Sequence, residues 1–187
     1  MANKDSAFGL RPIGKVGQNR DNQGLSEYDI AASASAIFQN DPVEMAATGT
    51  ITVAAATDLL LGSLTGVFFT DASTSKPTFA NHLKASNTAT DIKGFVSDDP
   101  YERFEIQSDD ATAAADVGLN ADIVYASGAT PNFVSKVELD HSDLKTATAQ
   151  LRVLGISKDI DNNEAGSANV NLVVMINEHF LKGTVGI

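Results

Sequence analysis

Cysteine is absent from the 187 residues of this chain, which excludes disulfide bonds, cysteine nucleophiles and thiolate metal ligands. Tryptophan is absent too, and aromatic residues make up 6% of the sequence. This scarcity leaves no aromatic platform for single-stranded nucleic acid and counts against a carbohydrate-binding module. No stretch approaches the roughly 18 apolar residues of a membrane-spanning helix, and no apolar signal region opens the sequence. We therefore expect a soluble chain, made in the cytoplasm, with neither nucleic acid nor membrane as partner.

Positive charge is scarce and unevenly distributed. The chain has 13 Lys and Arg against 24 Asp and Glu, a net charge of −11, which disfavours binding to a phosphate backbone. Residues 1–24 nevertheless carry four basic and two acidic side chains, so this stretch is positive while the remainder is strongly negative. Such an asymmetry suggests that residues 1–24 dock on an acidic surface; the alternative is that these basic residues are simply solvated.

Residues 1–24 are predicted to form an extended N-terminal arm. Four glycines interrupt the stretch, Pro12 blocks a helix, and polar residues fill positions 18–23. Apolar side chains nevertheless recur between the glycines, at Phe8, Leu10, Ile13 and Val16. Apolar residues in an extended segment predict burial, either against a partner or against the chain's own body.

Residues 25–187 are predicted to form a β-rich body, either a β-barrel or a β-sandwich, because helix formers are sparse and turn sequences separate many short runs of β-formers. A division into two small β subdomains, with a boundary near 98–100, is an open alternative. Residues 150–157 and 169–176 are expected to pair as a hairpin, while 71–91 is expected to be a surface loop. Short helical turns are expected at 57–64, 112–117 and 141–149. The predicted strands are 28–32, 36–39, 43–47, 50–54, 66–70, 92–97, 101–108, 122–126, 133–139, 150–157 and 169–176.

Two acidic stretches are candidate metal-binding or catalytic sites. Residues 159–166 begin like a calcium loop, but Glu164 stands where such a loop has glycine and Val170 where it has glutamate. The run of carboxylates between Asp98 and Asp110 is more simply a solvated strand edge than a catalytic or metal site. Neither the three histidines nor the glycines form a known catalytic or phosphate-binding motif. We therefore predict neither an enzyme nor a cofactor or metal.

The sequences Ala7-Phe8-Gly9-Leu10-Arg11-Pro12-Ile13-Gly14 and Gly24-Leu25-Ser26-Glu27-Tyr28-Asp29-Ile30-Ala31 provide a more specific clue. They resemble the opening of virion proteins of tailed bacteriophages, in particular capsid cement or head decoration proteins. The resemblance is sharpest over about the first 45 residues; beyond them only composition and strand layout are similar.

The resemblance implies a non-enzymatic protein on the outer capsid surface of a virion. Such a protein binds the major capsid protein and bridges neighbouring capsid subunits, and symmetry favours a homotrimer or homodimer. Within the arm, Phe8, Leu10, Arg11 and Ile13 are the predicted anchors, and Lys15 and Arg20 are expected to meet acidic capsid groups. Two alternatives stay open: another virion part, such as a tail or head-fibre base protein, and a hydrolase that uses the carboxylates of residues 98–110.

Overall fold

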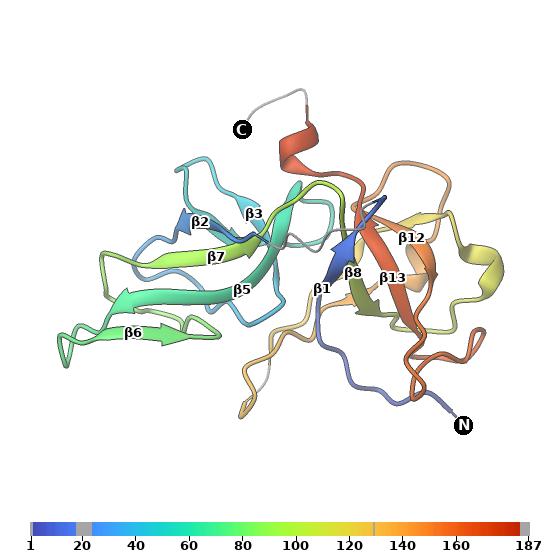
Figure 1. The fold of residues 1–187 in the computed structure, drawn as a ribbon, viewed down its shortest axis with the longest axis horizontal. Coiled ribbons are helices and arrows are strands. Elements are labelled where there is room, and N and C mark those ends of the chain that lie inside the picture. The colour runs from blue at the N-terminus through green and yellow to red at the C-terminus, as the bar shows by residue number, and fades with distance from the viewer. Residues whose placement is uncertain (1, 18–23, 129, 184–187) are drawn as a thin grey trace.

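The computed structural model describes residues 2–17, 24–128 and 130–183, and it is mainly β. Figure 1 shows two antiparallel sheets side by side. We name them sheet A and sheet B. Sheet A has the order β1 (Arg11–Lys15), β8 (Glu102–Gln107), β13 (Asn171–Ile176), β12 (Leu151–Ile156) and β9 (Asn120–Ala121).

Sheet B forms the other half of the molecule (Figure 1). Its order is β2 (Ser26–Asp29), β7 (Lys93–Ser97), β5 (Leu60–Thr70), β3 (Pro42–Met45) and β4 (Ile51–Val53), and β6 (Pro77–Ala80) pairs with the end of β5. A two-stranded sheet and three single-turn helices complete the described structure: β10 (Ile123–Val124), β11 (Glu138–Leu139), η1 (Ala114–Asp116), η2 (His141–Asp143) and η3 (Phe180–Lys182). None of these helices has the length and apolar character needed to span a membrane.

Each sheet has its own hydrophobic core. The residues of β13 alternate as predicted, so that Leu172, Val174 and Ile176 are buried on one face together with Phe104 of β8. A second cluster lies under sheet B and includes Leu64 of β5. Sheet A ends in the open strands β1 and β9 and does not close on itself, so the predicted barrel is not formed; several antiparallel sheets are compatible with a β-sandwich.

The hairpin predicted from residues 150–157 and 169–176 is confirmed, because β12 and β13 pair antiparallel. The helical turn expected at 57–64 is wrong: its second half begins the long strand β5, whose residues Leu60, Leu61 and Leu64 are fully buried in the cores. The surface loop expected at 71–91 contains strand β6. The chain passes from sheet B to sheet A between the end of β7 at Ser97 and the start of β8 at Glu102.

Candidate binding surface around the N-terminal segment

The N-terminal segment, residues 2–17, packs against the chain's own body. Its strand β1 forms the outer strand of sheet A, where Arg11 lies opposite Glu105 and Lys15 opposite Glu102. Of its apolar side chains, Leu10 is buried against the body and Phe8 is partly buried, whereas Ile13 and Val16 stay exposed. The extended arm predicted for residues 1–24 is not shown: among the described residues of this stretch, Arg11–Lys15 form an outer strand of sheet A, because β8 offers them a hydrogen-bonding edge.

Side-chain amides of the body hold the residues that precede β1. The Asn162 amide accepts from the N–H of Lys4 at 2.9 Å and donates to its C=O at 2.8 Å. Gln107 accepts from the N–H of Ser6 at 2.8 Å and also donates to the C=O of Lys4. Because both amides are buried, they satisfy the backbone of the segment much as a neighbouring strand would.

Leu10 is fully buried within the core of sheet A. Its N–H donates to the C=O of Asn40 at 2.9 Å, and its C=O accepts from the hydroxyl of Ser63. This side chain is therefore occupied inside the molecule and is not available as an anchor for a partner. The prediction that Leu10 contacts the capsid is corrected for this reason, and its role is to attach the segment to the body.

The basic side chains of the segment pair with carboxylates of the body. The Arg11 guanidinium forms an ion pair with Glu105 and lies 4.5 Å from the centre of the partly buried Phe8 ring. The ammonium of Lys15 contacts Asp99, and this hydrogen bond raises the pKa of Lys15 and lowers that of Asp99. Arg20 lies outside the described residues.

A β-bulge turns Ile13 outward. The register with β8 moves from Pro12 opposite Phe104 to Gly14 opposite Arg103, so Ile13 has no partner residue in the ladder. Gly14 supplies the positive φ of 142° at this point, and its N–H donates to the buried Glu102 carboxylate. Ile13 is consequently one of the exposed large hydrophobic residues of the structure.

Further exposed hydrophobic residues gather where the two sheets meet, and we call Val16, Leu25, Tyr101 and Leu181 the junction patch. The N–H of Val16 donates to the C=O of Tyr101 at 2.9 Å. Leu25 and Leu181 line one hollow of about 410 Å³, together with Lys15, Asp98 and Asp99. The four side chains are between 43% and 59% exposed. Exposed apolar groups rimmed by charges are typical of a protein-binding surface.

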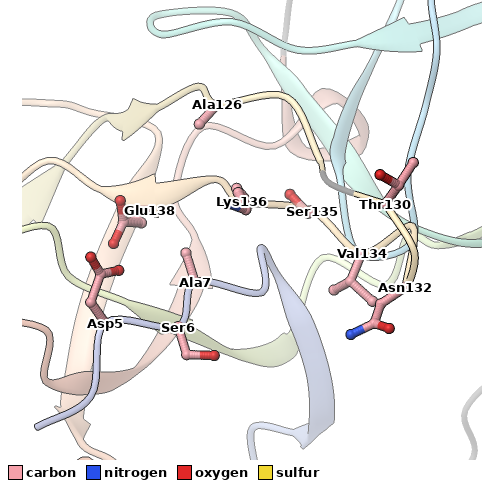
Figure 2. A pocket seen from close by; sticks show the side chains of 10 residues that line it. All are labelled: Asp5, Ser6, Ala7, Ala126, Thr130, Asn132, Val134, Ser135, Lys136 and Glu138. Carbon is pink, nitrogen blue, oxygen red and sulfur yellow. The ribbon is translucent and has the colours of Figure 1, made fainter.

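A second hollow, of about 440 Å³, separates the N-terminal segment from residues 126–138 (Figure 2). Asp5 of the segment and Glu138 of β11 lie near each other on one side of it. The pKa of Glu138 is raised, first by burial and then by the negative charges of Asp5 and Asp109. The lining of this hollow is mainly polar and includes one cation, Lys136.

Carboxylates of the two acidic stretches bind other side chains of the chain itself. In the 159–166 loop, Asp161 pairs with the ammonium of Lys4 at 2.7 Å, and Asp159 accepts from the Asn171 amide. In the second stretch, Asp98 accepts from the Tyr28 hydroxyl at 2.6 Å. Among the described residues, no three His, Cys, Asp or Glu side chains are grouped so that they could hold a metal ion.

The sequence alone pointed to the segment but missed most of its surroundings. Leu25, Tyr101 and Leu181 were not predicted as site residues, because each is an isolated apolar residue in its own stretch and only tertiary packing brings them together. The same holds for Asn162 and Gln107, whose amides recognise a backbone more than 100 positions away. Val16 had a signal, since it belongs to the apolar series of the predicted arm.

Comparison with known proteins gave no match: no family model, no curated protein and no solved structure is significantly similar to this chain.

Proposed function

We propose that this chain is a structural virion protein that binds the outer surface of a phage capsid and stabilises the lattice by bridging capsid subunits. One observation carries the proposal. The two stretches that resemble virion proteins form the outer strands of both sheets, β1 in sheet A and β2 in sheet B, and the junction patch lies beside them. Strands β1 and β2 thus lie at open edges and beside exposed apolar groups, where a partner can reach them, whereas Leu10 of the first stretch is buried.

We assign the contact with the capsid to the exposed residues and not to the whole predicted arm. Ile13 and the junction patch offer apolar area. Because these side chains are between 42% and 59% exposed, completing their burial contributes about half of the 1.5–3 kcal/mol that a fully exposed apolar side chain gains. Arg11 and Lys15 already have partners within the chain, so they gain little on meeting capsid carboxylates. Affinity for the lattice therefore depends mainly on apolar contact, and many copies per particle add avidity.

Co-sedimentation with capsids stripped of accessory proteins tests the proposal. Deleting residues 1–24 is a poor probe, because it removes β1 and exposes the core beneath Leu10. The double substitution Val16→Asp with Leu25→Asp changes only exposed side chains and introduces like charges into the patch. Ile160→Asp is the matched control. Ile160 is 87% exposed and lies in the loop between β12 and β13, so it is not part of the junction patch.

We expect the unmodified chain and Ile160→Asp to bind saturably at many copies per particle, and the double variant to lose this binding. Equal binding of all three proteins would remove the junction patch from the interface. A handful of copies per particle would favour a tail or head-fibre base protein over lattice cement. No binding at all would overturn the proposed function, and turnover lost on substituting carboxylates of residues 98–110 would favour the hydrolase.

A further inference from the structure

A row of three phenylalanine rings crosses the end of sheet B. Phe79 of β6 lies directly opposite Phe68 of β5, with ring centres 4.8 Å apart, and its centre is 6.5 Å from that of Phe95 on β7. Phe79 is 74% exposed, the largest value for any aromatic residue in the described structure. Cross-strand aromatic pairs stabilise a sheet, but they do not require that one ring of the row stays in water.

Strand β6 is also an edge strand without charge. Its residues are Pro77, Thr78, Phe79 and Ala80, and its only strand partner in the described structure is β5. Two other described edge strands have at least four residues, and both carry charges, at Arg11 and Lys15 in β1 and at Glu27 and Asp29 in β2. Charged side chains normally protect an edge from pairing with another chain, and β6 lacks this protection apart from Pro77.

The absence of charge indicates which partner fits this edge. In a twofold contact a strand pairs with its own copy, so an edge whose charges all have one sign, such as β1 or β2, would bring like charges together. A different protein could match a charged edge with the opposite charge, and would not need a neutral one. An uncharged strand with an exposed aromatic ring is therefore suited to a second copy of this chain.

We propose that β6 pairs antiparallel with β6 of a second copy, forming a dimer with a sheet continuous through both chains. A twofold axis perpendicular to the sheet keeps both Phe79 rings on the same face, so the two aromatic rows join. Pro77 has no N–H, which confines the new ladder to Thr78–Ala80. Because this ladder is short, burial of Phe79 supplies most of the stabilisation.

Sedimentation velocity over a range of protein concentrations tests the proposal on the full chain. We expect a concentration-dependent dimer for the unmodified protein, and a dissociation constant at least about tenfold weaker for Phe79→Lys. Ile160→Lys, the same change at another exposed apolar site, should leave the dimer unchanged. A monomer at all concentrations, a trimer, or a Phe79→Lys variant that dimerises like the unmodified chain would overturn the proposal.

Crosslinking provides a test that does not depend on how well the lysine variant folds. Because the chain has no cysteine, Phe79→Cys introduces a single thiol per copy. Mild oxidation should yield a covalent dimer with Phe79→Cys and far less with Ile160→Cys; equal yields would contradict pairing through β6. Neither experiment contains a capsid, so the dimer and the capsid-binding proposal fail independently of one another.

Discussion

The side-chain amide of Asn162 hydrogen-bonds both the N–H and the C=O of Lys4, at 2.9 and 2.8 Å. An amide side chain thus takes the place of a neighbouring strand for a residue 158 positions away in the sequence. Together with Gln107 it makes the N-terminal segment part of the body, and it fixes which side chains of the segment point inward. In this arrangement Ile13 and Val16 stay exposed and can contact a partner.

Replacing Gly9 by any residue with a side chain is predicted to destabilise the fold. Its φ is +73°, and a Cβ at this position would lie 2.3 Å from the C=O oxygen of Asn40 and 2.4 Å from Cβ of Ser135. Gly9→Ala combines backbone strain with a backbone clash and should lower the free energy of unfolding by about 3 kcal/mol or more. Gly49→Ala is the matched control, since φ is +78° there and a Cβ meets open space, so only strain of about 1 kcal/mol is expected. Urea unfolding of both variants measures the difference, and equal losses would contradict the predicted clash.

Leu10 and Ile13 are predicted to separate stability from binding. Leu10→Ala removes a fully buried side chain and should cost about 2–5 kcal/mol of unfolding free energy. Ile13→Ala removes a side chain that is 42% exposed on the bulge and should cost under about 1 kcal/mol, while it weakens capsid binding. Chemical denaturation and co-sedimentation of the two variants provide the check. If Ile13→Ala destabilised the fold as much as Leu10→Ala, the outward orientation of Ile13 would be wrong.

Asp41 is predicted to make the protein less stable as the pH rises from about 4 to 6. Burial raises the pKa of this carboxyl to about 6, although hydrogen bonds from Ser135 and from the N–H of Phe38 act in the opposite direction. An unfolded aspartate titrates near 4, so the folded state binds the proton more tightly. The resulting destabilisation develops between these two values, is complete above pH 6, and amounts to at most about 3 kcal/mol.

Replacing Asp41 by Asn isolates this effect. The gain in unfolding free energy of Asp41→Asn over the unmodified chain should increase from pH 4 to pH 7. Asp71→Asn is the control: hydrogen bonds from Thr74 and Ser73 lower the pKa of Asp71, so its contribution to stability changes only below about pH 4 and the effect of this substitution should stay constant from pH 4 to pH 7. Thermal or urea unfolding at several pH values gives both curves. A pH-independent difference for Asp41→Asn would show that folding does not raise the pKa of this carboxyl.

Local sequence patterns predicted strands correctly where one face of the strand lies in the core. The alternation of Leu172, Val174 and Ile176 and the polar tip of residues 158–166 predicted the β12–β13 hairpin correctly. The same reasoning failed at Thr57–Leu64, where three leucines in succession also fit a buried strand, and at β6, whose surroundings are rich in Ser and Thr. Periodicity cannot separate a short buried strand from a helical turn, or identify a strand with only four residues.

Composition and local pattern establish an acidic, mainly β protein without cysteine, and they show that its basic N-terminal stretch also contains apolar side chains. Which of these side chains are buried, and against what, depends on the packing of the whole chain. Whether Leu10 packs in the chain's own core or against a partner depends on Gln107, Asn162 and the free edge of β8, none of which is near it in sequence. Long-range contacts of this kind leave no local pattern, because each residue's neighbours in sequence say nothing about which distant backbone its side chain will meet.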